Sequence, residues 1–221
     1  MSKKNKDGFE TRAIHAGQKA DPTTGAVMMP IYTSSTFEQE SPGVHKGFDY
    51  SRSANPTRKA FEECIASLEN GEAGFGFSSG VAAISACVEL LTPGDHVIAM
   101  NDLYGGTVRL FNEIKTLSQG IEVTYVDMTD IKNVEAAKTD KTKMIFVETP
   151  TNPLLKVVDL SAIADFAKSA NILSVCDNTF ASPYVQQPLE HGIDIVLHLS
   201  LIHISEPTRQ EAISYAVFCL K

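Results

Sequence analysis

The sequence has no hydrophobic run long enough to cross a membrane. Its longest apolar stretch, around residues 81–91, is interrupted by Ser85 and Glu89, whereas a membrane-spanning helix requires about 18 apolar residues or more. The basic start of the chain, residues 1–6, is not followed by the apolar segment of a secretory signal. We therefore expect a cytoplasmic protein that does not bind membranes.

Cysteine is scarce, and metal-binding motifs are missing. The four cysteines, at positions 64, 87, 176 and 219, form no C-x-x-C pair, and the six histidines include no H-E-x-x-H motif. We expect reduced, mostly buried thiols and no metal site. The formal net charge of −8 argues against binding to nucleic acids.

What is present is a regular alternation of helical and extended patterns that starts near Pro56. Short apolar segments alternate with segments in which apolar residues recur at helical spacing. This order predicts an α/β fold, with a mostly parallel sheet and helices on both faces. We expect strands at 73–77, 96–100, 122–126, 144–147, 172–176 and 193–197, and helices from Pro56 to just before Asn70 and at 80–91, 107–117, 131–138 and 160–170.

Two of these helices have apolar faces that the spacing defines, and the start of the chain has none. The faces are Leu110, Ile114 and Leu117 in the helix at 107–117, and Leu160, Ile163, Ala164 and Ala167, directed inward, in the helix at 160–170. Residues 1–45 have weak periodicity and are punctuated by prolines and glycines. We expect an extended arm that lies over a surface, such as that of a partner subunit.

Residues that follow the strands are the first candidates for chemistry, because parallel sheets bind ligands beyond the carboxyl ends of their strands. Ser78-Ser79-Gly80-Val81 joins a strand to a helix, where free backbone N–H groups favour an anion such as phosphate. A plain helix N-cap with a glycine for a tight turn is the alternative, and this segment alone favours it. Asp177 also follows a strand, and its carboxylate suits either a protonated ring nitrogen or a local Asx turn.

Two further side chains have both a binding and a structural interpretation. Tyr104 precedes Gly105-Gly106, which leave space for a flat aromatic ligand against its ring; ordinary aromatic packing is the alternative. Arg52 lies in a polar stretch, where it is either a bidentate phosphate ligand or a solvated loop arginine. The residues alone leave both pairs of interpretations open.

A serine hydrolase is the alternative function from a different class. Gly76-Phe77-Ser78-Ser79-Gly80 matches G-x-S-x-G in the strand-turn-helix context that an exposed nucleophile requires. Asp177 and then His191 or His198 follow in the chain order of a catalytic triad. In this interpretation, Ser78 would be the nucleophile.

Five motifs in a fixed order carry a more specific resemblance. They are YSRSANPTR at 50–58, SG at 79–80, DLYGGT at 102–107, ETPTNP at 148–153 and DNTF at 177–180. Over about residues 9–198, the chain resembles the Cys/Met-metabolism family of pyridoxal-phosphate enzymes. The resemblance implies an arm at 1–45 and, at 46–198, the cofactor-binding large domain of a fold-type I pyridoxal-phosphate-dependent transferase.

The resemblance also implies which residues hold the phosphate of pyridoxal 5′-phosphate. Ser79, Gly80 and Val81 would surround this phosphate, the last two through their backbone N–H groups. Tyr50 and Arg52 would reach the phosphate in the neighbouring subunit. The family assembles as a dimer of dimers, so a homo-oligomer with these two residues acting in trans is expected.

The cofactor ring and the substrate would contact a second group of residues. Asp177 would pair with the protonated ring nitrogen, which keeps the ring an electron sink. Tyr104 would stack on the ring and assist proton transfer, Asn152 would contact the phenolic oxygen, and Thr179 would lie against the ring. Arg109 would approach the substrate or remain a surface arginine of its helix.

The activity that the resemblance implies is that of a lyase cleaving a carbon–sulfur bond of a sulfur amino acid. Abstraction of the α- and then the β-proton would lead to loss of the γ-sulfur group, as in a cystathionine γ-lyase of transsulfuration. The motifs at 47–53 and 180–184 favour this branch over cystathionine γ-synthase and methionine γ-lyase, which remain alternatives.

The chain departs from the family after the strand at 193–197. The family continues with Ser-x-Thr-Lys, whose lysine forms the Schiff base, whereas the only lysine after Lys168 in this chain is Lys221. Residues 199–221 resemble translated sequencing-adapter read-through and are expected to be a tail from outside the family. We therefore expect a truncated, inactive chain with an incomplete sheet, whose exposed edge invites aggregation.

Overall fold

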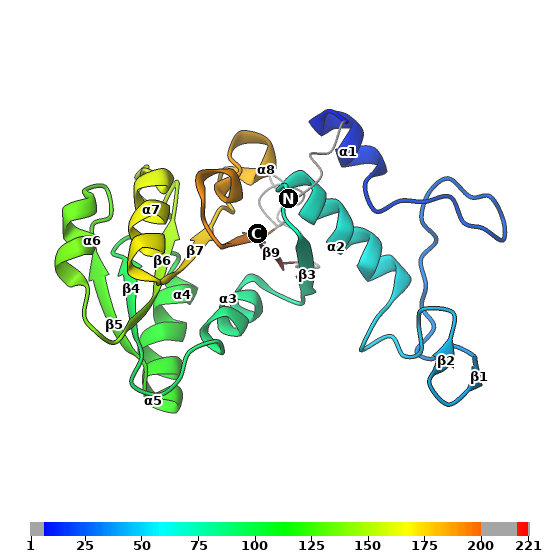
Figure 1. Ribbon diagram of the computed structural model, residues 1–221, viewed down its shortest axis with the longest axis horizontal. Helices are drawn as coiled ribbons and strands as arrows, with labels where there is room; N and C mark the ends of the chain where they lie inside the picture. Colours follow the sequence, from blue (N-terminus) through cyan, green and yellow to red (C-terminus); the bar gives the residue numbers. More distant parts are fainter. Residues whose placement is uncertain (1–6, 200–215, 221) are drawn as a thin grey trace.

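The computed structural model describes residues 7–199 and 216–220 of the chain. Its centre is a seven-stranded sheet in the order β3-β9-β8-β7-β6-β4-β5 (Figure 1). The strands are β3 (Ala73–Phe77), β4 (His96–Met100), β5 (Glu122–Val126), β6 (Thr142–Glu148), β7 (Leu173–Asp177), β8 (Ile195–Leu199) and β9 (Ala216–Leu220). The strands from β8 to β5 are parallel, and only β9 is antiparallel to its neighbours. The predicted mostly parallel sheet is confirmed.

Helices connect the strands and cover both faces of the sheet. They are α2 (Pro56–Leu68), α3 (Gly80–Val88), α4 (Gly105–Arg109), the π-helix η1 (Leu110–Lys115), α5 (Thr116–Gln119), α6 (Ile131–Ala137), α7 (Leu160–Ala170), α8 (Ser182–Val185) and the short 3-10 helix η2 (Pro188–His191). Right-handed crossovers place α3, α4 and α5 on one face, and the returning connections place α6 and α7 on the other. Contacts of α3 with α4 and of α6 with α7 agree with this arrangement.

The helix boundaries follow local sequence signals. Asn55 caps α2 by accepting hydrogen bonds from the N–H groups of Thr57 and Arg58, and Pro56 occupies the first turn. In α7, all four residues expected to face inward are buried, and Asn171 ends the helix in the left-handed conformation. The helix predicted at 80–91 is shorter and ends at Val88.

The apolar face predicted for the helix at 107–117 is wrong. Ile114 and Leu117 are 52% and 79% exposed, and only Leu110 of the predicted face is buried. The cause is η1, because its wider turns bring every fifth residue to the same face. Leu110 and Lys115 are consequently both buried, and the Thr116 hydroxyl donates to the Phe111 carbonyl at 2.8 Å.

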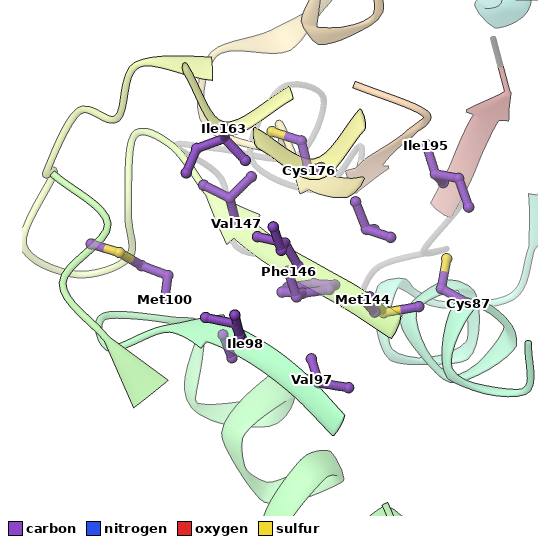
Figure 2. Close-up of a cluster of buried hydrophobic side chains, with 14 of the residues drawn as sticks. Cys87, Val97, Ile98, Met100, Met144, Phe146, Val147, Ile163, Cys176 and Ile195 are labelled. Carbon is purple, nitrogen blue, oxygen red and sulfur yellow. The ribbon is translucent and has the colours of Figure 1, made fainter. Parts of the chain in front are cut away.

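The core is made chiefly by β4 and β6, which are buried on both faces. The Val97–Met100 and Met144–Val147 segments are fully buried, and the rings of Phe111 and Phe146 meet edge-to-face at 5.4 Å. Figure 2 shows Ile98, Phe146 and Val147 within this cluster. A core of this kind fixes the strands and therefore the positions of the loops that follow them.

The cysteines agree with the sequence prediction. Cys87, Cys176 and Cys219 are buried, Cys64 is half-buried, and all four are free thiols. Burial raises the pKa of Cys87 to about 12, and the pKa of Cys219 is also raised by its burial and by the charge of Glu69. Thiols with such raised pKa values stay protonated at neutral pH and are poor nucleophiles.

The N-terminal segment extends away from the sheet, beyond α2 (Figure 1). It begins with α1 (Phe9–His15), which packs on α2, and it contains the hairpin of β1 (Gln39–Ser41) and β2 (Val44–His45). Between α1 and the hairpin, the chain lacks helices and strands apart from a bridge of Thr36 to Tyr50. The part of the chain before α2 therefore contains little regular secondary structure, and the division into an arm at 1–45 and a large domain stays a prediction.

Strand β9 lies between β8 and β3 in the sheet. Its residues come from the segment 199–221, which the sequence assigns to a tail from outside the family, and it pairs with both β8 and β3. The backbone groups of β8 are thus hydrogen-bonded on this side. The remainder of that segment, 200–215 and 221, lies outside the described residues.

Candidate functional site

Three carboxylates meet at the carboxyl ends of neighbouring parallel strands. Glu148 ends β6, Asp177 ends β7, and Asp102 follows β4. Glu148 and Asp177 are register partners, so their side chains leave the same face of the sheet side by side. The location agrees with the rule that such sheets bind ligands at this edge.

Asp177 is buried, with only 8% of its surface exposed. Burial raises the pKa of its carboxyl, while hydrogen bonds from Thr179 and the nearby charge of His198 lower that pKa. The Thr179 N–H donates to Oδ1 at 3.0 Å, which is the Asx turn that the sequence offered as the structural interpretation. The turn engages Oδ1, and the site can still use the carboxylate as a fixed negative charge.

Glu148 is a functional candidate that the sequence interpretation gave no role. It is 5% exposed, and its pKa is raised to about 8 by burial and then by the charge of Asp177. Hydrogen bonds from the backbone N–H groups of Tyr104, at 2.9 Å, and Asn152 oppose this rise. An acidic residue at the end of an otherwise apolar strand is the sequence signal that marks it.

Tyr104 presents a half-exposed ring above Gly106. The tyrosine is 46% exposed, and its backbone N–H is held by Glu148. A Cβ atom built on Gly106 would lie 2.4 Å from Cε1 of this ring, whereas one built on Gly105 would meet nothing within 4 Å. The second glycine of the pair therefore sets the ring position, and the ring face is available to a flat ligand.

We expect Gly106→Ala to displace the Tyr104 ring without destabilising the chain. Alanine favours the start of α4 by up to about 1 kcal/mol, but its methyl group overlaps the ring. If a flat ligand stacks there, its affinity should fall by about three- to tenfold. Gly105→Ala is the matched control, because it increases the helix propensity of α4 equally and should leave the affinity for the flat ligand unchanged. Equal ligand affinities of the two variants would contradict the prediction.

The start of α3 has the features of a phosphate cradle and of an ordinary cap. Ser79 is the N-cap, and its hydroxyl accepts a hydrogen bond from the Ala82 N–H at 3.1 Å. The backbone N–H groups of Gly80 and Val81 have no acceptor within the helix, as at every helix N-terminus. The atoms nearest to a Cβ built on Gly80 belong to the Leu199 side chain, at 3.6 Å.

Tyr50 and Arg52 contact each other and lie apart from the strand ends. Arg52 Nη2 donates to the Tyr50 hydroxyl at 2.6 Å, and its guanidinium carbon lies 4.9 Å from the centre of the tyrosine ring. Figure 1 shows their segment, between β2 and α2, on the side of α2 away from β4, β6 and β7. The structure does not bring this pair to the three carboxylates of its own chain.

The remaining predicted residues divide between the site and the surface. Asn152 lies in the loop after β6, and its backbone N–H is bound by Glu148. Thr179 follows Asp177, and its hydroxyl accepts a hydrogen bond from the Leu199 N–H at 3.1 Å. Arg109, at the end of α4, is exposed.

The residues of the hydrolase alternative do not form a triad. His198 Nε2 is bonded to Glu69 Oε1 at 2.5 Å, and His191 Nδ1 is bonded to the Ser161 hydroxyl at 3.0 Å. Neither histidine is hydrogen-bonded to Ser78. A nucleophile without a base within hydrogen-bond reach lacks the arrangement that activates it.

Two absences hold for the described residues. Within 7–199 and 216–220, no group of histidine, cysteine and carboxylate side chains is arranged to hold a metal ion. None of the helices in these ranges combines the length and the apolar character that crossing a bilayer requires.

The chain is similar to known enzymes over most of its length. Residues 10–205 match the family described as Cys/Met metabolism PLP-dependent enzyme. The chain is 58% identical to cystathionine beta-lyase of Coxiella burnetii over 193 residues, and 50% identical to cystathionine gamma-lyase of Dictyostelium discoideum over 199 residues. These matches cover 87% and 90% of the chain but 50% and 51% of the relatives, so the chain spans about half the length of the curated relatives it matches.

A solved structure shows the same fold. The crystal structure of cystathionine gamma-lyase from Lactobacillus plantarum complexed with L-serine has a TM-score of 0.92 and 47% sequence identity. The match covers 97% of this chain and 55% of that chain.

Proposed function

The chain belongs to the Cys/Met metabolism family of PLP-dependent enzymes, and we propose that the carboxyl edge of its sheet is the pyridoxal phosphate site of a C–S lyase. The observation that carries this proposal is the buried Asp177 carboxylate at the end of β7, with the exposed face of Tyr104 at the same edge. The cofactor would supply an electron sink for the substrate carbanion.

The chemistry of the residues fits this cofactor. A buried carboxylate, Asp177, suits a pyridinium nitrogen, because burial strengthens its attraction for a cation. The Tyr104 ring offers a stacking surface, and the N-terminus of α3 at Ser79, Gly80 and Val81 suits a phosphate dianion. Asn152 and Thr179 lie on the two loops that flank Asp177 and Glu148, within the same edge of the sheet.

We propose that the site is completed by a second copy of the chain. Tyr50 and Arg52 are polar, lie apart from the site of their own chain, and bond only to each other through their side chains in the described residues. An arginine paired with a phenol is a suitable phosphate donor set. The proposed assembly is a homo-oligomer, a dimer of dimers, in which these residues act in trans, and the proposed location is the cytoplasm, where thiols such as Cys87 remain reduced.

The proposed reaction is that of a cystathionine γ-lyase, with cystathionine γ-synthase and methionine γ-lyase as alternatives. Tyr104 would transfer a proton at its phenol, and Arg109 would approach the substrate. Cleavage of cystathionine with water on the γ side yields cysteine, 2-oxobutanoate and ammonia, whereas cleavage on the β side yields homocysteine, pyruvate and ammonia. Identification of the keto acid formed by the full-length protein tests the assignment, since pyruvate would contradict it.

We expect the 221-residue chain to form no borohydride-reducible adduct with pyridoxal phosphate at this site. Lys156, in the loop after β6 at the carboxyl edge of the sheet, is already engaged, because its Nζ binds Asp127 Oδ2 at 2.6 Å. Reduction followed by peptide mass spectrometry measures the adduct. The expectation would be contradicted by a single modified lysine whose adduct slows amide hydrogen exchange at Tyr104 or Asp177. Binding of pyridoxamine 5′-phosphate, which forms no lysine adduct, is the control for an intact site.

A further inference from the structure

The two loops that carry Tyr104 and Asn152 are tied together by a pair of carboxylates. Glu148, at the end of β6, accepts hydrogen bonds from the backbone N–H of Tyr104, in the loop after β4, and from the N–H of Asn152. Asp102, in the loop after β4, accepts in return from the N–H of Leu154 at 3.1 Å and from the hydroxyl of Thr151, in the loop after β6. Glu148 at the end of β6 thus binds the loop after β4, and Asp102 in the loop after β4 binds the loop after β6.

These carboxylates are buried and serve neutral donors. Asp102 and Glu148 are only 7% and 5% exposed, and Thr151 is fully buried. Among the described residues, neither carboxylate takes part in an ion pair. A buried carboxyl group without a cation is costly, so its hydrogen bonds are the compensation that the fold provides.

The loop after β6 does not require Asp102 to close its turn. Within this loop, the N–H groups of Leu155 and Lys156 donate to the carbonyl and hydroxyl oxygens of Thr151, at 3.0 and 2.9 Å. The Thr151 N–H donates to the Lys156 carbonyl at 3.0 Å. The bonds to Asp102 therefore add a connection between loops to a turn that is already formed.

We propose that Glu148 and Asp102 form a reciprocal clamp that positions Tyr104 and Asn152 relative to each other for the cofactor ring. The inference rests on the proposed function, because it takes the ligand to be pyridoxal phosphate. Glu148 and Asp102 are positioning residues that act through the backbone of the two loops. The clamp fixes the ring of Tyr104 and the amide of Asn152 before the cofactor arrives, so little affinity is lost in ordering them.

Amide hydrogen exchange without cofactor tests the clamp itself. In the 221-residue chain, Glu148→Ala should increase exchange of the Tyr104 and Asn152 amides by roughly tenfold or more, because both lose their acceptor. Glu148→Gln retains one acceptor oxygen, so at least one of these two amides should exchange like the wild type. Asp102→Ala removes the acceptor and should increase exchange of the Leu154 amide. Asp102→Asn should increase exchange at Leu154 alone, and only if the asparagine turns its amide nitrogen toward that N–H. Glu135→Ala, at an exposed position of α6, is the control for nonspecific loosening.

Affinity for pyridoxamine 5′-phosphate, which needs no lysine adduct, tests the role toward the cofactor. Glu148→Ala should raise its dissociation constant by about tenfold or more, and Glu148→Gln should restore it to within about threefold of the wild type. Unchanged exchange at Tyr104 and Asn152 in Glu148→Ala, or a Glu148→Gln variant as weak as Glu148→Ala, would overturn the clamp. A different result would overturn the proposed function: the variants show the expected amide exchange, but the wild type does not bind pyridoxamine 5′-phosphate. The role of the clamp toward the cofactor would fall with it.

Discussion

Replacing Asp177 with alanine is expected to weaken the binding of pyridoxamine 5′-phosphate by about 10- to 100-fold. The lost interaction is a charge-assisted hydrogen bond between a buried carboxylate and a ring nitrogen, which contributes about 1.5–3 kcal/mol. The ligand is fluorescent, so a titration of the 221-residue chain measures the dissociation constant. This probe separates the noncovalent site from any reaction with a lysine.

Two further variants define what the Asp177→Ala result means. Asp177→Asn keeps a side-chain oxygen for the Asx turn with Thr179 but removes the charge, so it should bind almost as weakly as alanine. Asp165→Asn, at an exposed position of α7, removes a charge elsewhere and should leave affinity unchanged. Wild-type affinity in Asp177→Asn would show that the charge does not hold the ligand and would contradict the assignment.

Glu148→Gln is expected to stabilise the unliganded chain at neutral and mildly alkaline pH. The pKa of Glu148 is raised from 4.5 to about 8, so between these values the folded chain retains a proton that the unfolded chain releases. The free energy of unfolding of the wild type therefore falls as pH rises from about 4.5 to about 8, by at most on the order of 5 kcal/mol for this group. Glutamine does not titrate and avoids this loss.

Urea unfolding at a series of pH values measures the effect. The wild type and Glu148→Gln should converge near pH 4 and separate toward pH 8, with the variant more stable. The neighbouring Asp177, whose pKa is also raised, contributes a loss of the same sign in both proteins. Asp127, whose pKa is lowered to about 2 by Lys156, changes stability only in acid, where its contribution is lost. Parallel curves from pH 4 to pH 8 would contradict the prediction, and Glu135→Gln should follow the wild type.

The sequence predicts the elements whose signals are local. Strands β3, β4 and β5 and helix α7 have the expected bounds, because short apolar or aromatic segments and an amphipathic helix are recognisable from the local sequence pattern. Asp177 and Tyr104 were predicted as ligand-binding candidates for a similar reason, because each follows a strand whose end the sequence pattern predicts. The assignment of their partners depended on the resemblance to a family.

The features that the sequence did not predict depend on contacts between distant residues. The π-helix η1 rotates Ile114 and Leu117 out of the core, and no local pattern distinguishes it from an α-helix. The pairing of β9 with β8 and β3 joins residues far apart in the chain. The pKa of Glu148 is raised first by its burial and then by the charge of Asp177 on the neighbouring strand, and both depend on the fold and on strand register.

The protonation state of the bound ring nitrogen shows whether Asp177 holds the cofactor ring. Pyridoxamine 5′-phosphate labelled with 15N in its ring, bound to the 221-residue chain, can be observed by NMR at a pH where the free ligand has lost its ring proton. We expect a protonated ring nitrogen in the wild type and an unprotonated one in any ligand that still binds to Asp177→Ala. An unprotonated nitrogen in the wild-type complex, or the same signal from both proteins, would contradict the assignment of Asp177 and of the site built around it.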